Sequence, residues 1–559
     1  MNENERMAEL LLPQITKTPE DYEAMYPLRP LPEGARVVRV APSPTGYLHL
    51  GVLFMALVNR MAAGSAGSVF YLRIEDTDKK REVEGGIADI VAGIQRFGIT
   101  IDEGFTGGDI ETGAYGPYRQ SARAEIYQAY VKDLLRQGLA YPCFCMPEEL
   151  TAVREAQEAQ KVRTGYYGKW AVHRNITVDE AAEKIAAGLP FVIRLKSPGS
   201  EENRIRFEDC IKGKIEMPEN DEDFVLLKSD GIPTYHFAHA IDDHLMRTTH
   251  VIRGDEWISS TPKHLQLFRL LGFKPPKYAH AAPIMKLDGG AKRKISKRKD
   301  PEAAVRYFIE EGFPPESVIE YLMTILSSDF EAWRKANPHA NYRQFPFQFK
   351  KMSVSGALFD TDKLYDVSKN IISTLHSEQV TERLLVWARE YDPDFYAILN
   401  RDLAYTRRVF AIDRDVPKPR KDIVKWSDAK AYAAYFYAPL YTPCYDLPEN
   451  ITPATAVEIL KAYAAVYKPE TDRQVWFQAI KGICPALGFA AETKEFKQNP
   501  TAYKGHAGDV STVIRIAVTG RRNTPDLCSI MYLLGEETCR ARLLAAQRFY
   551  EENGKGEPR

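Results

Sequence analysis

Two stretches of the sequence carry residue types suited to binding phosphate. The first is Arg39–Val52, where a turn rich in proline and glycine leads into His49 and Gly51 at the start of a predicted helix. Unpaired amides and the positive dipole end of a helix N-terminus favour anions, and Gly51, which lacks a Cβ, would let a flat ring such as adenine lie against the backbone. Taken alone, this stretch is equally consistent with a turn that contains an incidental histidine.

The second stretch is Lys292–Lys299, KRKISKRK, a dense basic loop with one serine. Lysine acts on phosphate as a point charge, so such a loop could clamp a polyphosphate. A solvated surface or a nucleic-acid patch is the common alternative for a run of this kind. The place of the loop, directly after the second half of a predicted sheet, favours the clamp.

A strand–helix–strand unit is expected to position the first stretch. Val37–Ala41 is rich in β-branched residues, Tyr47–Met61 has apolar residues at helical spacing, and Ser68–Ile74 is a second predicted strand. Such units pair their strands in parallel with a right-handed crossover. Glu75 directly follows the second strand, where acidic side chains face the ligand crevice of an open α/β sheet and could hold an ammonium group.

The α/β pattern resumes near residue 224. Phe224–Lys228 and His250–Arg253 are predicted strands, and Pro233–Ile241 between them begins a helix that carries Tyr235 and His239.

Three candidates sit at or just after the end of the second of these strands. Arg253 could pair with a carboxylate through its fork of N–H donors, Glu256 could accept a hydrogen bond from a ribose hydroxyl, and Trp257 could wall a pocket. A structural ion pair is the alternative for Arg253.

Composition restricts the remaining possibilities. The chain of 559 residues has 44% hydrophobic and 27% charged residues and a formal net charge of −1, so any nucleic-acid binding must come from local patches. No apolar run approaches the ~18–20 residues of a membrane span, and the N-terminus does not resemble a signal peptide, so a cytoplasmic location is expected. Residues 1–35 are polar and proline-punctuated, with one short helix predicted near Arg6–Leu12.

Seven scattered cysteines give no disulfide framework. Cys143 and Cys145 could be half of a zinc site, but Tyr166–His173 offers only His173 and tyrosines as further ligands. From about residue 300 the pattern is predominantly helical, and its aromatic and basic clusters could bind structured RNA; an ordinary helical domain is the alternative.

With both stretches in view, the sequence resembles the class I aminoacyl-tRNA synthetases, and most closely the bacterial-type glutamyl-tRNA synthetases. His49-Leu50-Gly51-Val52 resembles the HIGH motif of the family, and Lys294–Arg298 resembles its KMSKS motif in the glutamyl form. The segments LRIEDTD, GPYRQS, THVIRGDEW and VTGRRNTPDL are also similar, in the family's order. The resemblance extends from about Arg36 to the C-terminus.

The resemblance implies an α/β fold in which a Rossmann-type catalytic domain with an inserted acceptor-binding domain precedes an all-helical anticodon-binding half. The implied boundaries are an N-terminal extension at 1–35, catalytic halves at 36–130 and 228–290, an inserted acceptor-stem-binding domain at 131–227, the KMSKS loop with a stem-contact domain at 291–370, and the anticodon-binding domain at 371–559.

The implied activity is ATP-dependent activation of L-glutamate to glutamyl-adenylate, with Mg²⁺ and release of diphosphate. The glutamyl group is then transferred to the 3′-terminal ribose of tRNA(Glu), and the resemblance leaves open whether tRNA(Gln) is a second acceptor. Members of the family are mostly monomeric. The implied catalytic residues are His49, Lys294 and Lys297. Those implied to surround glutamate are Arg39, Ser43, Glu75, Tyr235, His239, Arg253 and Trp257. Those implied to hold ATP are His49, Gly51, Glu256, Met285 (through its backbone), Ser296 and Lys297.

Two departures from the family pattern affect these expectations. His239 stands where the family often has asparagine, in the glutamate pocket. Trp170 stands where a third zinc-binding cysteine is expected, so the resemblance leaves Cys143 and Cys145 without a bound metal, as a remnant of a zinc site.

Four alternatives remain at this stage. Glutaminyl-tRNA synthetase shares the catalytic architecture but has a β-barrel anticodon-binding part, whereas the pattern here is helical. A truncated relative that glutamylates a tRNA base lacks the C-terminal half. A catalytically silent RNA-binding paralogue would not need His49 and the lysines, and a nucleotidyltransferase acting on other substrates would not need the helical half.

Overall fold

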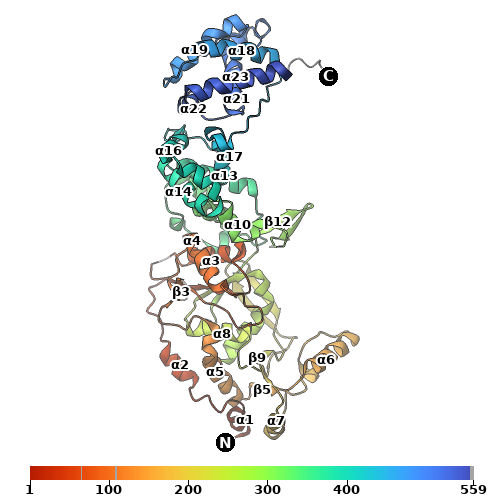
Figure 1. Cartoon of the computed structure of the whole chain (residues 1–559). Helices are drawn as coiled ribbons and strands as arrows, with labels where there is room; N and C mark the ends of the chain where they lie inside the picture. Colours follow the sequence, from red (N-terminus) through yellow and green to blue (C-terminus); the bar gives the residue numbers. More distant parts are fainter. Residues whose placement is uncertain (65, 108–109, 297, 554–559) are drawn as a thin grey trace. The chain divides into compact units, whose positions relative to one another are not determined.

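The computed structural model describes residues 1–64, 66–107, 110–296 and 298–553, and the chain divides into two compact units. The first comprises Met1–Phe308 and Val318–Thr361, and the second comprises Ile309–Ser317 and Asp362–Arg559. Figure 1 shows strands in the first unit and only helices labelled in the second.

Two sheets that lie side by side form the centre of the first unit and are together called the central sheet. In the first, β1 (Val37–Val40), β2 (Val69–Leu72) and β3 (Glu103–Gly107) pair in parallel in this order. In the second, β10 (His250–Gly254) and β11 (Lys277–Ala281) pair in parallel, and β10 contacts β1. The two halves meet where the Thr249 N–H donates to the Val37 carbonyl oxygen at 2.9 Å. All four residues of β1 are buried, as expected of a strand covered on both faces. The short antiparallel β4 (Ile110–Thr112) extends the β3 edge.

Three helices connect or precede these strands. Helix α3 (Leu50–Ala62) joins β1 to β2, α8 (Tyr235–Leu245) precedes β10, and α9 (Thr261–Leu270) joins β10 to β11. The apolar positions of α3 recur at helical spacing, and Leu50, Leu53, Phe54, Leu57 and Val58 are buried. From β1 the chain continues outward to β2, and from β10 it continues outward on the other side to β11. Open α/β sheets bind ligands at such a switch point, next to the carboxyl ends of the two strands.

The inserted region is built on an antiparallel sheet. Its strands are β5 (Ala140–Cys143), β6 (Val192–Leu195) and β9 (Val225–Leu227). Between them lie α6 (Pro147–Ala159), η2 (Gly168–Trp170) and α7 (Val178–Ala186).

One hairpin of the inserted region joins the central sheet. Strands β7 (Arg204–Asp209) and β8 (Gly213–Pro218) are antiparallel, and β7 bridges β11 through Asp209 and Tyr278. A backbone bridge between residues so far apart in sequence leaves no local pattern from which it could be predicted.

The N-terminal extension forms two helices, where the sequence predicted one. Helices α1 (Glu3–Leu11) and α2 (Pro19–Met25) pack on α5 (Ala124–Arg136). Lys132 Nζ of α5 lies 2.8 Å from a Glu9 carboxylate oxygen of α1, and Arg247, which follows α8, places its Nη2 2.7 Å from a Glu23 carboxylate oxygen of α2.

Further elements complete the first unit and the connecting segments. They are α4 (Gly86–Arg96), η1 (Gln120–Arg123), η3 (Asp255–Ser260), β12 (Met285–Asp288), β13 (Ala291–Lys294), η4 (Pro301–Ala303), α10 (Val305–Glu310), α11 (Pro315–Leu326), α12 (Phe330–Ala336), η5 (Tyr342–Gln344) and η6 (Phe349–Lys351).

The second unit is helical and contains two hydrophobic cores, one formed mainly by residues 372–437 and one by residues 451–550. No helix in the described part of the chain is both long and apolar enough to span a membrane. The elements are α13 (Thr361–Thr374), α14 (Ser377–Tyr391), α15 (Pro393–Asn400), α16 (Leu403–Ala411), α17 (Asp428–Ala433), η7 (Ala434–Phe436), η8 (Ala438–Leu440), α18 (Pro453–Val466), α19 (Arg473–Leu487), α20 (Thr493–Gln498), η9 (Pro500–Ala502), α21 (Ala507–Thr519), α22 (Leu527–Leu534) and α23 (Glu536–Asn553). The predicted order, an α/β part followed by a helical part, is confirmed.

Candidate active site at the carboxyl ends of β1 and β10

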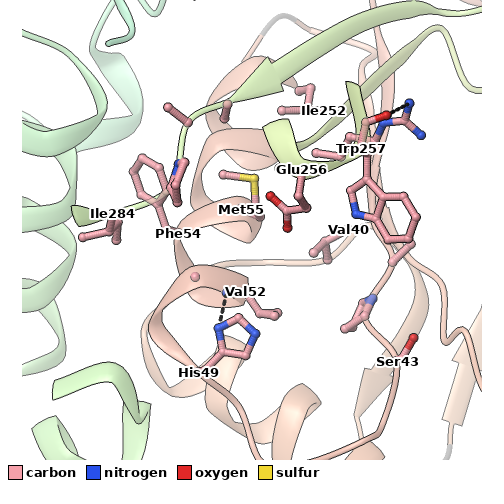
Figure 2. A pocket seen from close by; sticks show the side chains of 18 of the residues that line it. Val40, Ser43, His49, Val52, Phe54, Met55, Ile252, Glu256, Trp257 and Ile284 are labelled. Atoms are coloured by element: carbon pink, nitrogen blue, oxygen red, sulfur yellow. Dashed lines mark hydrogen bonds between the residues drawn. The ribbon is translucent and has the colours of Figure 1, made fainter. Parts of the chain in front are cut away.

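A cavity of about 510 Å³ opens at the switch point of the central sheet. Figure 2 shows it from close by, with the Glu256 carboxylate between His49 and Trp257. Residues from both sequence stretches and from both halves of the sheet line this space. The lining residues that the sequence analysis singled out are Arg39, Ser43, His49, Gly51, Glu75, Tyr235, Arg253, Glu256, Trp257 and Lys294.

His49 caps the N-terminus of α3. Its Nδ1 accepts a hydrogen bond from the Val52 N–H at 3.3 Å (Figure 2), and the first turn of α3 contains no acidic residue. A neutral imidazole that accepts at Nδ1 carries its proton on Nε2, which becomes a donor. A Cβ on residue 51 would lie 3.0 Å from the His49 ring, so Gly51 lets the ring lie against the start of the helix. Both features suit an anionic ligand.

A buried ion cluster supports the opposite side of the cavity. Arg39 Nε lies 3.0 Å from Asp243 Oδ1, and Arg73 reaches both Asp243 (Nη1 to Oδ1, 3.0 Å) and Glu75 (Nη2 to Oε1, 2.9 Å). Burial alone would raise the pKa of Asp243, but Arg39 and Arg73 outweigh it and hold that pKa well below its usual range. Burial raises the pKa of Glu75 against the opposing effect of the same arginines.

Arg253 is held by neutral acceptors on several sides. Its Nε donates to His280 Nε2 at 3.0 Å, its Nη1 to His264 Nδ1 at 3.1 Å, and its Nη2 to Thr261 Oγ1 at 3.1 Å. His280 Nδ1 in turn lies 2.7 Å from Asp209 Oδ2. Burial lowers the pKa of His280 although Asp209 opposes it, so the ring is neutral and presents Nε2 as an acceptor.

Tyr235 and Trp257 form an aromatic wall beside Arg253. Their ring centroids are 4.2 Å apart, and the Tyr235 hydroxyl accepts from Arg253 Nη1 at 3.4 Å. Burial raises the pKa of Tyr235, which stays a neutral phenol.

Two residues that were predicted to contact substrate lie outside the lining of the cavity. His239 does not line the cavity: it is fully buried behind Tyr235, with ring centroids 5.9 Å apart and Nδ1 2.6 Å from Asp243 Oδ2. Burial lowers the pKa of His239 to about 3. Met285 also lies outside the lining, and its N–H donates to the Ala357 carbonyl oxygen while its own carbonyl oxygen accepts from the Phe359 N–H.

The basic loop is held at its base. Lys294 Nζ lies 3.8 Å from Glu256 Oε1, and both side chains are more than half exposed. The Ser296 N–H donates to Asp300 Oδ2 at 2.9 Å, and Arg293 pairs with the same carboxylate at 2.6 Å. Ser296 does not line the cavity. Lys297 lies outside the described residues.

Sequence reasoning missed the residues that support the cavity from behind. Asp243 and its neighbour Asp242 bind arginines from distant segments, and His264, His280 and Asp209 fix Arg253. The local signal was the pair of adjacent aspartates on a helix whose other buried residues, apart from His239, are apolar. Cys143 and Cys145 lie outside the cavity, at the end of β5 in the inserted region.

Comparison with known proteins agrees with this geometry. The family described as tRNA synthetases class I (E and Q), catalytic domain, matches residues 36–365, and an anticodon binding domain matches residues 423–547. A glutamate–tRNA ligase of Clostridium perfringens (strain 13) is 51% identical over 543 residues, 96% of this chain and 100% of that protein. One of Gloeobacter violaceus is 34% identical over 94% of this chain and 98% of its own length.

Among solved structures, a glutamate tRNA ligase from Elizabethkingia meningosepticum in complex with its amino acid superposes with a TM-score of 0.72. It is 26% identical, and the match covers 92% of this chain and 99% of that one. Together with the two signature stretches in one cavity, these matches settle the family. The chain belongs to the class I tRNA synthetases (E and Q).

Proposed function

We propose that this chain is a glutamate–tRNA ligase that activates L-glutamate with ATP and transfers it to the terminal ribose of tRNA. The observation that carries the proposal is that a single cavity is lined by His49, Gly51 and Lys294 on one side and by Glu75 and Arg253 on the other. Groups suited to binding phosphate thus share one cavity with the Glu75 carboxylate, which could bind an ammonium group, and with Arg253, which could bind a carboxylate.

The glutamate end is assigned to the buried side of the cavity. Arg253 would bind the side-chain carboxylate against the wall of Tyr235 and Trp257, and Glu75 would bind the ammonium group. Ser43 and the face of Arg39 turned to the cavity would complete the site. Hydrogen bonds and ion pairs already orient Arg253 and Glu75, and the carboxylate of glutamate would replace the two longest bonds of Arg253, those to the Tyr235 hydroxyl and the Trp257 carbonyl oxygen at 3.4 Å.

The nucleotide end is assigned to the N-terminus of α3 and the basic loop. His49 Nε2–H and Lys294 would donate to the phosphates, Gly51 would pack against adenine, and Glu256 would accept from a ribose hydroxyl. ATP enters as its magnesium complex, and Lys297 would join Lys294 at the diphosphate. Attack of the glutamate carboxylate on the α-phosphate needs no enzyme nucleophile, so catalysis comes from positioning and electrostatic stabilisation.

The test is an aminoacylation assay with labelled glutamate on purified tRNA(Glu) and tRNA(Gln), measured side by side. We expect the protein to be a monomer located in the cytoplasm. Charging of tRNA(Glu) alone defines a discriminating enzyme, and charging of both defines a non-discriminating one. Transfer of glutamine to tRNA(Gln) would support the glutaminyl alternative. If neither tRNA is charged and ATP–diphosphate exchange is absent with tRNA present, the proposal fails in favour of a silent tRNA-binding paralogue.

A further inference from the structure

Two buried arginines line the amino-acid side of the cavity, and they differ in the partners that hold them. Arg39 is 3% exposed and lies against the carboxylate of Asp243, with 3.0 Å between Nε and Oδ1. Arg253 is 5% exposed, and every hydrogen bond that it donates to a described residue ends on an imidazole, a hydroxyl or a carbonyl oxygen. In the described part of the chain, no carboxylate pairs with it directly.

A buried charge without an opposite charge beside it is costly. Arginine stays protonated in proteins, so Arg253 cannot become neutral by losing a proton. A buried ion costs far more free energy than a buried neutral group unless it is both hydrogen-bonded and paired. The chain supplies hydrogen bonds to Arg253 and leaves the opposite charge to a ligand.

His264 makes one of the closest contacts to Arg253. It lies near the N-terminus of α9 and is fully buried, and its Nδ1 accepts from Arg253 Nη1 at 3.1 Å. Because arginine has only donors, the lone pair must be on His264 Nδ1 and the ring proton on Nε2. That Nε2 lies 2.9 Å from Nδ1 of His236, which therefore accepts. The direction of both hydrogen bonds is fixed.

The surroundings of His264 keep its ring uncharged. Burial lowers the pKa of His264 well below its usual range, and His239, Arg253 and His236 act in the same direction against Asp243. The ring centroids of His264 and His239 are 4.4 Å apart. Burial also lowers the pKa of His236 to about 4. A protonated His264 would have no lone pair for Arg253, so this residue serves as an acceptor without a charge.

The second imidazole on Arg253 also separates it from an acid. His280 Nε2 accepts from Arg253 Nε at 3.0 Å, and the carboxylate of Asp209 contacts the other ring nitrogen, Nδ1, at 2.7 Å. The ring of His280 thus stands between the guanidinium and the carboxylate. Arg39 and Asp243, in contrast, are in direct contact.

We propose that His264 is a specificity-determining residue, which orients Arg253 through an uncharged acceptor so that the amino acid itself must bring the compensating carboxylate. The proposal depends on glutamate being the substrate. The side-chain carboxylate of glutamate would satisfy both the donors and the charge of Arg253. The amide of glutamine has nearly the same shape but is neutral, and its NH₂ group cannot accept from a guanidinium. Selection would then rest on charge, by leaving a buried cation unpaired when glutamine binds.

An acidic residue at position 264 could hold Arg253 equally well. Side-chain oxygens of aspartate and asparagine are two bonds from Cβ, as is Nδ1 of histidine, so all three can reach the same guanidinium. Aspartate would also be favoured by the helix dipole near the N-terminus of α9. It would, however, pair with Arg253 as Asp243 pairs with Arg39, and so cancel the charge on which glutamate binding depends.

The test therefore compares His264→Asn with His264→Asp. Both variants place an oxygen near the former Nδ1 and lose the bond to His236, and they differ by one charge. ATP–diphosphate exchange with tRNA present gives the KM for glutamate and the inhibition constant of glutamine as its competitor. In His264→Asp the KM for glutamate should be about 10–100-fold higher than in His264→Asn, the scale for one hydrogen bond to a charged group, while glutamine inhibits no more weakly.

The ratio of the two constants separates this role from a structural one. His250→Asn and His250→Asp, at the opposite end of β10, are the matched control pair and should give equal ratios. Equal ratios in the two variants of His264 would overturn its role while leaving glutamate as the substrate. If wild type does not use glutamate at all, the proposed function fails and takes this role with it.

A measurement on the unmodified chain covers the case in which His264→Asp does not fold. Two-bond ¹H–¹⁵N correlation spectra of protein labelled at histidine report which ring nitrogens carry protons, and His264→Asn identifies the signals of His264. At neutral pH its ring should be neutral with the proton on Nε2, both before and after L-glutamate is added. A charged ring, or a proton on Nδ1, would overturn the proposal.

Discussion

The two ends of the cavity are built in opposite ways. At the end proposed to bind glutamate, Arg39, Glu75 and Arg253 are each less than a tenth exposed and are fixed by ion pairs or hydrogen bonds. At the nucleotide end, Lys294 and Glu256 are more than half exposed and form a pair with a separation of 3.8 Å.

From this difference we expect the glutamate end to select the amino acid and the nucleotide end to promote the chemical step. A rigid, desolvated pocket discriminates by leaving buried polar groups unpaired when the wrong amino acid binds. An exposed basic side chain can instead move onto the phosphates and stabilise charge that develops only during the reaction. The glutamate end should therefore respond to substitution in the binding of one substrate, and the nucleotide end in the rate of the chemical step.

The largest effect is expected from Arg253→Ala. The variant would remove the partner of a carboxylate and leave His264 and His280 without their donor, a loss of the kind that costs 2–5 kcal/mol or more, so kcat/KM for glutamate should fall about 10³-fold. ATP–diphosphate exchange with tRNA present measures it. Arg269→Ala, an exposed arginine of α9, is the control. A defect confined to the KM for ATP would contradict the assignment.

Next in size is Lys297→Ala, for which the rate of adenylate formation should fall about 10²–10³-fold, the scale for losing one transition-state partner. Single-turnover kinetics at saturating ATP and glutamate give this rate. Lys299→Ala, whose Nζ lies 3.6 Å from Asp288 on the exposed side of the loop, should behave as wild type. Unchanged activation in Lys297→Ala would remove the role proposed for this lysine.

Asp209→Asn tests the glutamate end from a distance. The amide would donate to His280 Nδ1 and shift the ring proton to Nε2, which then opposes Arg253 Nε. A lost charge-assisted hydrogen bond is worth about 1.5–3 kcal/mol, so the KM for glutamate should rise about 10–100-fold while the KM for ATP stays constant. Glu208→Gln, on the neighbouring exposed position of β7, is the control. Equal changes in both KM values would indicate a general structural defect.

The smallest effect concerns pH. Because burial raises the pKa of Glu75, its carboxyl group takes up a proton at a higher pH than an exposed glutamate would, and a neutral carboxyl attracts an ammonium less. The kcat/KM for glutamate should therefore decline as the pH falls, by no more than about tenfold per unit for one titrating group. In Glu75→Gln that decline should be absent and the starting value lower. If kcat/KM for glutamate still declines at low pH in Glu75→Gln, the group that titrates is a residue other than Glu75.

The sequence predicted the parts of this molecule that depend on neighbouring residues. The strand, turn and helix around His49 and Gly51, and the residues that follow β2 and β10, are set by local proline and glycine spacing and by hydrophobic period. These features, with the family resemblance, were enough to predict the α/β order and the polar residues that line the cavity, but not most of its apolar lining.

The supporting contacts could not be predicted, because they join residues that are remote in sequence. Nothing local indicates that Asp243 will pair with Arg39, that Asp209 will reach His280, or that His264 will accept from Arg253. His239 shows the same limit. Its position in a motif suggested contact with substrate, and only the packing of Tyr235 in front of it reveals that it is buried.

The buried cluster around Asp243 also restricts how the enzyme can evolve. Breaking a buried pair by changing one partner costs about 3–5 kcal/mol, a large part of the 5–15 kcal/mol that keeps a typical protein folded. Arg39, Arg73 and Asp243 share such pairs, so a lineage cannot replace one of them without passing through a severely weakened protein. Substitutions that keep the protein folded are therefore expected at positions around the amino-acid pocket that lie outside this cluster.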